Sequence, residues 1–129
     1  MILLDTHAVL WLAQVPELLS DDAREAISSA RQKDGVAIAD ETLWELAMLV
    51  SKGRVGVRTS LRDFLTAVER HCTVLPVTGA IAERAVQFSK GYPGDPTDRL
   101  IGATAVVHGL ELVTKDEGIR GSGEVKCVW

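Results

Sequence analysis

The sequence predicts an α/β fold in which helices cover both faces of a parallel sheet. Short apolar segments alternate along the chain with longer segments that have the apolar spacing of amphipathic helices. The short segments are continuous apolar runs, which is typical of strands buried on both faces. No internal repeat, low-complexity segment or linker interrupts the alternation, so residues 1–129 are predicted to form a single domain.

Five of the short apolar segments are expected to be strands. Pro76 lies in the third of them and cannot donate a ladder hydrogen bond, which favours an edge position for that strand. In chain order, the expected strands are residues 1–4, 36–39, 73–77, 111–114 and 124–129.

The segments between the strands carry helix start and stop signals. Asp5 or Thr6 can cap the first helix and Ser20 the second, and glycines follow the ends of several helices. The helix after the second strand has acids in its first turn and Lys52 in its last, which suits the helix dipole. In chain order, helices are expected at 7–14, 16–35, 40–53, 59–71, 78–91 and 97–109, with a clear loop at 91–96 and no element assigned to 115–123.

Composition and charge limit the classes of partner. The formal net charge of −4 excludes a globally basic nucleic-acid binder, so a nucleic-acid partner would need a local basic patch or a metal ion. Cys72 and Cys127 are far apart and form no CxxC motif, which indicates reduced core cysteines. The apolar N-terminus carries Asp5 and lacks a leading Lys or Arg, so we expect no signal peptide, no membrane span and a cytoplasmic location.

Acidic residues stand where the strands of a parallel sheet would end. Asp5 follows the first strand and Asp116 the fourth, while Asp95 and Asp98 begin the helix that leads into the fourth strand. Because ligands of such sheets bind at the carboxyl ends of the strands, we expect these acids at one edge. Glu45 lies one helical turn into the helix after the second strand, among apolar neighbours, where a carboxylate is costly to bury alone.

A hard divalent cation resolves the repulsion among such carboxylates, some of which would otherwise be protonated. Mg²⁺ and Mn²⁺ prefer oxygen ligands, and such an ion activates water and neutralises charge on a phosphate. The chain has no P-loop lysine motif and no Cys/His cluster. An all-acid site on an α/β domain therefore points towards phosphodiester hydrolysis.

Four segments occur in a fixed order along the chain: LLDTHAVLWL (3–12), LWELAMLVSKGRV (43–55), DPTDRLIGATAVVHGL (95–110) and LVTKDEGIR (112–120). Together they resemble the PIN-domain ribonucleases, and among these the VapC-type toxins of toxin–antitoxin modules. The resemblance covers essentially the whole chain. It implies a three-layer α/β/α PIN domain over residues 1–129 with strand order 3-2-1-4-5. It also implies a Mg²⁺- or Mn²⁺-dependent endoribonuclease that cleaves RNA, forms a homodimer and is neutralised by a cognate VapB-type antitoxin.

The resemblance also implies the roles of individual residues. The four acids of the family, which hold the metal and are catalytic, fall on Asp5, Glu45, Asp98 and Asp116. Asp95 is a nearby auxiliary acid, and Thr6 and Thr114 can offer hydroxyls to the water shell of the metal. Relatives often carry Ser in place of Ala39 and Thr42, Lys in place of Leu49 and an aromatic in place of Thr97, and none of these departures removes a metal ligand.

For several other residues the sequence leaves more than one role open. Arg99 and Lys115 flank two of the acids and are either surface charges or phosphate contacts. His7 is expected to be packed or to lie behind the metal ligands, Trp11 and Trp44 are expected in the core, and Trp129 is either sheet packing or an exposed contact. The basic run at 52–62 is either a solvated stretch or a contact for RNA or an acidic antitoxin segment, through Lys52, Arg54, Arg58 and Arg62.

Alternatives to a nuclease remain. Asp5 could be only a helix cap, and Asp98 only a first-turn acid behind a Thr97 cap, but neither role explains Glu45. A receiver-like signalling domain would need an aspartate at the end of the third strand, and that strand ends in PVTGA, without an acid. A non-catalytic PIN-like binding module is the other alternative, against which all four acids argue.

Overall fold

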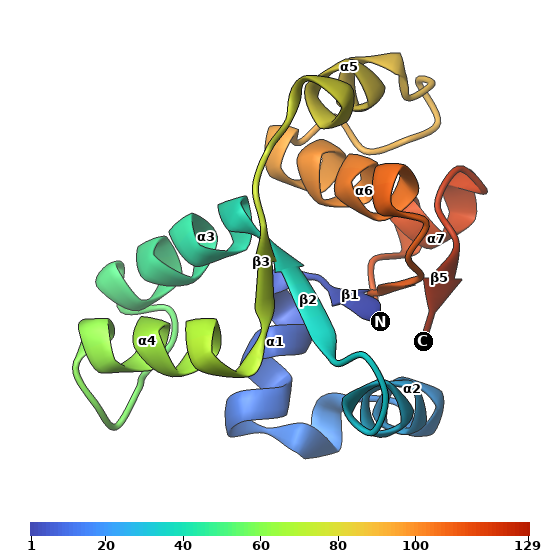
Figure 1. Ribbon diagram of the computed structural model, residues 1–129. Coiled ribbons are helices and arrows are strands. Elements are labelled where there is room, and N and C mark those ends of the chain that lie inside the picture. Colours follow the sequence, from blue (N-terminus) through green and yellow to red (C-terminus); the bar gives the residue numbers. More distant parts are fainter.

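The computed structural model describes residues 1–129 and has a single five-stranded parallel sheet between two layers of helices (Figure 1). The strand order is β3-β2-β1-β4-β5, which confirms the predicted topology. β3 is an edge strand, as predicted, and it ends one residue before Pro76. The strands are β1 (Ile2–Leu4), β2 (Val36–Ala39), β3 (Thr73–Leu75), β4 (Leu112–Val113) and β5 (Cys127–Val128).

The helices agree with the expected segments except at two places. In the expected segment 16–35 a short 3₁₀ turn comes first, and the α-helix begins at Asp21, directly after the predicted Ser20 cap, which is confirmed. A helix that the sequence did not predict follows β4. None of the helices is both long and apolar enough to cross a membrane. The helical elements are α1 (Thr6–Gln14), η1 (Pro16–Leu18), α2 (Asp21–Arg31), α3 (Asp40–Ser51), α4 (Leu61–His71), α5 (Gly79–Gln87), α6 (Pro96–His108) and α7 (Glu117–Ser122).

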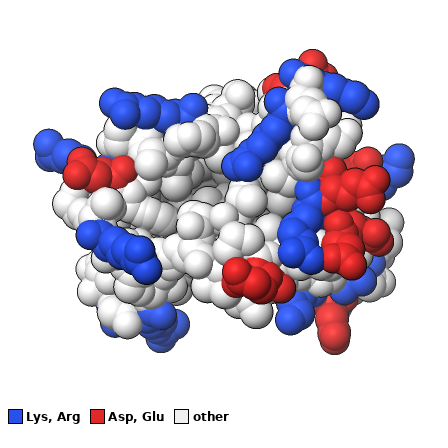
Figure 2. Space-filling view, turned by 90° about the horizontal axis from the view of Figure 1, so that it is seen from below, with Lys and Arg blue, Asp and Glu red and all other residues white.

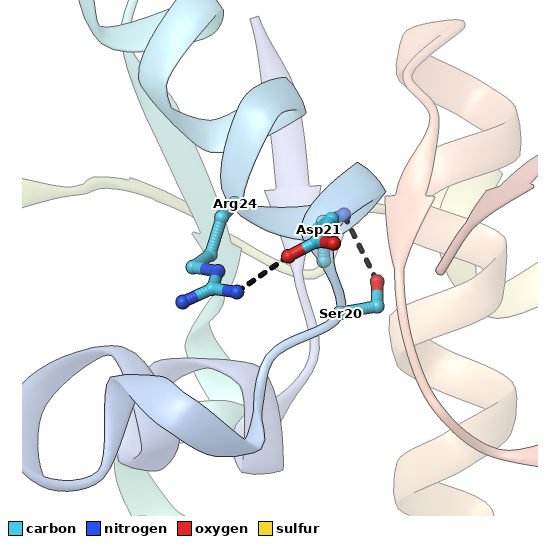
Figure 3. Close-up of polar contacts among 4 residues, drawn as sticks. Ser20, Asp21 and Arg24 are labelled. Carbon is cyan, nitrogen blue, oxygen red and sulfur yellow. Dashed lines mark hydrogen bonds and ion pairs between the residues drawn. The ribbon is translucent and has the colours of Figure 1, made fainter.

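The predicted Ser20 cap explains why the segment 16–35 contains a 3₁₀ turn and a separate α-helix. Figure 3 shows the start of α2, where the Ser20 hydroxyl accepts a hydrogen bond from a backbone N–H and Arg24 pairs with Asp21. The donor to Ser20 is the amide of Ala23. Because Ser20 takes an extended conformation to make this contact, the 3₁₀ turn before it cannot continue into α2.

Alternate residues of the strands face two separate apolar layers. Leu4 and its neighbours pack against α1, α2 and α4, whereas Leu3 and its neighbours pack against α5, α6 and α7. Both leucines are fully buried, so replacing either with alanine is expected to cost about 2–5 kcal/mol.

The topology brings four helix N-termini to one edge of the sheet. α1, α3 and α7 begin just after β1, β2 and β4, and α6 begins at the same edge because its crossover to β4 returns along the sheet. α6 ends at Gly109, whose φ of 66° lies in the left-handed region that glycine adopts without strain. The helix N-termini give this edge a positive electrostatic potential that favours anionic side chains.

Candidate functional site

One pocket, of about 540 Å³, collects the acids that the sequence places at this edge. All four expected metal ligands line it, as do the auxiliary Asp95 and the expected hydroxyl donor Thr6. Thr114, the other hydroxyl donor, is buried behind the pocket wall. The lining residues are Asp5, Thr6, His7, Trp11, Glu45, Asp95, Asp98, Ile101, Lys115, Asp116 and Glu117.

Three of these acids are helix N-caps, and each uses the same carboxylate oxygen for the cap. Asp5 Oδ1 accepts from the Ala8 amide at 2.8 Å at the start of α1. Asp116 Oδ1 accepts from the Ile119 amide at 2.9 Å at the start of α7. Asp95 Oδ1 accepts from the Thr97 and Asp98 amides at the start of α6. Asp95 is therefore the N-cap of α6, and the expectation of a Thr97 cap is wrong. In each case Oδ2 is not used by the cap.

Buried threonine hydroxyls support the caps. Thr114 is fully buried, its hydroxyl accepts from the Asp116 amide at 3.1 Å, and it also hydrogen-bonds the Asp5 side chain. The Thr6 hydroxyl donates to that of Thr42 on α3 at 3.3 Å, which ties α1 to the helix that carries Glu45. The threonines therefore fix the relative positions of the acids through hydrogen bonds inside the protein.

Two carboxylates of the pocket, Asp98 and Asp5, have a raised pKa. Burial, followed by the negative charges of Asp95, Asp116, Glu45 and Asp5, raises the pKa of Asp98 from 3.8 to about 7. Burial also raises the pKa of Asp5, against the opposing effect of its hydrogen bond with Thr114. These charge effects show that the carboxylates share one electrostatic environment, which a bound cation would stabilise.

The turn of α6 that carries Asp98 is held by Tyr92. The Tyr92 hydroxyl donates to the backbone carbonyl of Asp98 at 2.7 Å, and its ring stacks on Phe88 with the centroids 4.0 Å apart. Gly102 makes room for the hydroxyl, since a Cβ there would lie 2.1 Å from it. The sequence offered no signal for this support beyond the glycine inside an apolar helix.

Arg99 does not lie with the acids. Its guanidinium donates to the backbone carbonyls of Ala85, Phe88 and Ser89. These hydrogen bonds satisfy carbonyl groups at the C-terminal end of α5. It is absent from the pocket lining, whereas Lys115 is present. Of the two expected phosphate contacts, only Lys115 is placed where it can serve that purpose.

The donor chemistry of the pocket suits a hard cation. Six carboxylates line one cavity, and three of them have an oxygen that the cap does not use. No three His, Cys, Asp or Glu side chains converge closely enough to hold an ion in this arrangement. Ionised carboxylates repel one another, so a closer approach without a cation would be unfavourable. The residues fit Mg²⁺ or Mn²⁺, which take oxygen ligands and retain several waters.

An aromatic wall stands opposite part of the acid cluster. The ring centroids of His7 and Trp11 are 5.7 Å apart, those of Trp11 and Trp129 are 5.6 Å apart, and Lys115 Nζ lies 5.6 Å from the Trp11 centroid. Trp11 is only partly buried, and Trp44 is 65% exposed, so the expectation of two core tryptophans is wrong for Trp44. The apolar spacing of α3 did not reveal which of its apolar residues faces solvent.

Two further acids at this edge lie outside the pocket. Asp40 accepts from the Val77 amide at 3.2 Å and so joins the start of α3 to the end of β3. Burial, together with the neighbouring Asp40 carboxyl, raises the pKa of Glu41 to about 7. These two acids belong to a pair at the sheet edge and not to the acid cluster.

The basic run at 52–62 does not line the acid pocket. Arg58 instead lines a larger cavity, of about 810 Å³, between α1, α4 and the end of α2. Ten of its 17 lining residues are hydrophobic and only one is acidic, so it offers no metal site. Figure 2 shows the face seen from below, where blue side chains stand apart on the left and acids gather on the right, on the side of α2.

The chain matches known proteins over most of its length. The PIN domain family matches residues 2–122. A relative named Ribonuclease VapC22, from Mycobacterium tuberculosis (strain ATCC 25618 / H37Rv), is 38% identical over 119 residues, or 92% of this chain and 89% of the relative.

Solved structures are similar in fold. One is VapBC2 from Rickettsia felis bound to a DNA fragment from their promoter, with a TM-score of 0.77, 17% identity, and coverage of 98% of this chain and 97% of that chain. Another is FitAcB from Neisseria gonorrhoeae, with a TM-score of 0.71, 22% identity, and coverage of 98% and 96%. At such low identities these structures support the fold alone.

Proposed function

Because the chain belongs to the PIN domain family, we propose that it is a Mg²⁺- or Mn²⁺-dependent endoribonuclease and the toxin of a toxin–antitoxin pair. The observation that carries the proposal is the gathering of six carboxylates, from four helices or their N-caps, in one pocket at the sheet edge. The relative with 38% identity is named as a VapC ribonuclease, which supports the same activity for this chain.

Asp5, Glu45, Asp98 and Asp116 are the proposed metal ligands, and the oxygens of Asp5 and Asp116 that the caps do not use are suited to this task. When bound, the metal supplies charge neutralisation and an activated water for attack on a phosphodiester. Asp95 is proposed to hold a metal-bound water, and the hydroxyls of Thr6 and Thr114 to orient the first and fourth acids. None of the acids is required to act as a nucleophile. Lys115, which is exposed and lines the pocket, is the proposed phosphate contact.

The proposed partners are a VapB-type antitoxin and a second copy of the chain. Several similar structures are named as VapBC complexes, including VapBC-1 from nontypeable Haemophilus influenzae, which supports such an assembly here. Lys52, Arg54, Arg58 and Arg62 are the proposed contacts for RNA or for an acidic antitoxin segment. Gel filtration with light scattering, with and without a co-expressed VapB-type antitoxin, measures both associations.

Asparagine substitutions test the proposed ligands without removing the caps. An alanine at position 5 would remove both a charge and the N-cap of α1, and the loss of the cap alone costs about 1 kcal/mol. Asp5→Asn and Asp116→Asn keep an oxygen that accepts the capping hydrogen bond. We expect each to lower metal-dependent RNA cleavage at least a hundredfold and to abolish growth inhibition, with Tm little changed. Asp22→Asn, at the start of α2, is the matched control and should cleave normally.

A non-catalytic PIN-like binding module is the second candidate, and Mn²⁺ titration separates the two. A nuclease should bind Mn²⁺ in the wild-type protein and bind it less tightly in Asp5→Asn and Asp116→Asn. Full cleavage and toxicity in these variants would refute the assignment of the ligands.

A further inference from the structure

We propose that the loop between α5 and α6, residues 88–95, is a brace that sets the relative positions of Asp98 and Asp116. In this loop, Tyr92 and Ser89 act as positioning residues for the proposed metal site, although neither of them lines the pocket. The inference rests on the proposed function and deepens it, because it assigns part of the metal affinity to contacts outside the pocket.

Asp98 and Asp116 need such a brace because no single element carries both. Asp98 lies in the first turn of α6, whereas Asp116 caps α7, which follows the next strand of the chain. Burial, then the charge of Asp95 and then that of Asp116 raise the pKa of Asp98, so Asp98 and Asp116 repel each other when no cation lies between them. Contacts elsewhere must therefore hold the two helix starts together in the metal-free protein.

Tyr92 joins the loop to α6. Tyr92 is 2% exposed, and its hydroxyl donates to the backbone carbonyl of Asp98 at 2.7 Å. Its ring occupies a notch at Gly102, one turn further along α6, where a Cβ would lie 2.8 Å from Tyr92 Cζ. The Phe88 ring stacks on the Tyr92 ring with the planes 6° apart. These contacts fix Tyr92 against α6, so the backbone at Asp98 cannot shift without breaking one of them.

Pro93 joins the loop to the first turn of α7. A Cβ at Gly118, the second residue of α7, would lie 3.0 Å from Pro93 Cγ and 3.1 Å from Asp116 Oδ1. The proline ring therefore packs against the turn that Asp116 caps, and the lack of a side chain at Gly118 allows this close approach. Tyr92 and Pro93 are neighbours in the chain, so one planar peptide unit connects the contact with α6 to the contact with α7.

Ser89 joins the other end of the loop to the end of α7. Its hydroxyl and amide both donate to the Glu124 carboxylate, at 2.7 and 3.2 Å, and these hydrogen bonds lower the pKa of Glu124. The Glu124 amide donates to the Ser122 hydroxyl, which donates to the Ile119 carbonyl in α7. Because the Tyr92 amide donates to the Ser89 carbonyl at 3.1 Å, both anchors belong to one hydrogen-bonded turn. The loop thus contacts α7 near both of its ends.

Mn²⁺ binding measures the effect of the brace without any RNA. We titrate Mn²⁺ into the protein and follow the EPR signal of the free ion. Tyr92→Phe keeps the stacked ring and loses the hydrogen bond to Asp98, so it should weaken Mn²⁺ binding about tenfold, the lower end for partners that orient a metal ligand. Ser20→Ala is the matched control, because it also removes one hydrogen bond at a helix start, and it should bind Mn²⁺ like the wild type. Equal affinity in Tyr92→Phe and the wild type, or an equal loss in Ser20→Ala, would overturn the proposal.

Ser89 tests the contact with α7. Ser89→Ala should weaken Mn²⁺ binding about threefold, in line with the loss of the hydrogen bond from its hydroxyl to Glu124. Ser89→Thr keeps a hydroxyl and should restore the affinity. If the alanine and threonine variants bind Mn²⁺ alike, the link between the loop and α7 does not position the site and the brace is refuted.

RNA cleavage supplies a separate readout. In Tyr92→Phe the Mn²⁺ concentration for half-maximal cleavage should rise about tenfold, while the rate at saturating Mn²⁺ should stay within about twofold of the wild type. A lower rate at saturating Mn²⁺ with unchanged Mn²⁺ affinity would show that Tyr92 acts through something other than the metal site, against the inference.

The two proposals fail in different ways. If Asp98→Asn binds Mn²⁺ as tightly as the wild type, the assignment of Asp98 as a ligand is wrong, and the brace is refuted with it. If Asp98→Asn loses Mn²⁺ binding while Tyr92→Phe and Ser89→Ala keep it, the ligand stands and the brace alone is refuted.

Discussion

Asp98→Asn should stabilise the metal-free protein while abolishing the proposed activity. The side chain of Asp98 makes no hydrogen bond within the protein. Only its backbone amide takes part in the cap, by donating to the Asp95 side chain. Replacing the carboxylate with an amide therefore removes a repelled charge and leaves the cap intact. An enzyme whose site is strained by its own charges should become more stable when one of them is removed.

The pKa of Asp98 sets the size and the pH window of the effect. Burial and the neighbouring acids raise this pKa from 3.8 to about 7. Each pH unit corresponds to about 1.4 kcal/mol, so the upper limit is about 4 kcal/mol. Asp98 is half-buried and partly screened by water, which reduces the expected gain to roughly 1–2 kcal/mol, or about 3–10 °C in Tm.

The sign follows from proton linkage. Because folding raises the pKa of Asp98, the folded state binds this proton more tightly than the unfolded state. The contribution to stability is fully present below about pH 4 and is lost as the pH rises through about 7. The advantage of Asp98→Asn over the wild type should therefore be small at pH 4 and reach its full size at pH 8.

Urea unfolding in EDTA at pH 4, 6 and 8 measures this difference. The matched control is Asp63→Asn, because Asp63 has the same place in α4 that Asp98 has in α6: the third helical residue, whose amide donates to the N-cap side chain. Asp63 is exposed and stands at a favourable helix start, so its loss should be neutral or slightly destabilising. If Asp98→Asn is no more stable than the wild type at pH 8, or if Asp63→Asn gains as much, the argument from charge repulsion is wrong.

Three further predictions concern stability. Gly102→Ala should cost about 1–3 kcal/mol in urea unfolding because its Cβ would meet the Tyr92 hydroxyl at 2.1 Å, whereas Gly94→Ala, with open space around it, should be tolerated. Arg99→Met should lower stability by about 1–3 kcal/mol, since it leaves carbonyls at the end of α5 without their donor, and should leave cleavage per folded molecule unchanged. Ser20→Ala should cost about 1 kcal/mol in thermal unfolding through loss of the α2 cap, with normal cleavage.

The sequence alone could predict the fold because its signals are local and repeated. Apolar runs marked the strands, and glycines and capping residues marked most helix ends. Helix α7 was missed because its six residues, EGIRGS, include two glycines and no amphipathic spacing. The cap of α6 was placed two residues late, since Asp95, Thr97 and the intervening proline all favour a helix start and only the backbone decides among them.

The composition of the pocket was predictable, while the environment of each side chain was not. The acids follow strand ends, and a parallel sheet brings strand ends together whatever the details of packing. The destination of Arg99 depends on where α5 ends relative to α6, which involves residues 11 to 14 positions apart in the chain. Likewise, the exposure of Trp44 depends on which helices cover α3, and no local pattern encodes that.

The sharing of carboxylates between helix caps and the pocket constrains how such a protein can lose its activity during evolution. At Asp5, Asp95 and Asp116 a replacement must still accept a backbone hydrogen bond, so drift is expected to lead to Asn, Ser or Thr. Glu45 and Asp98 cap no helix. Apolar residues can therefore replace them with little loss of stability, or even with a gain. Inactive descendants of this chain should therefore carry small polar residues at the three capping positions, and hydrophobic substitutions should accumulate first at the other two.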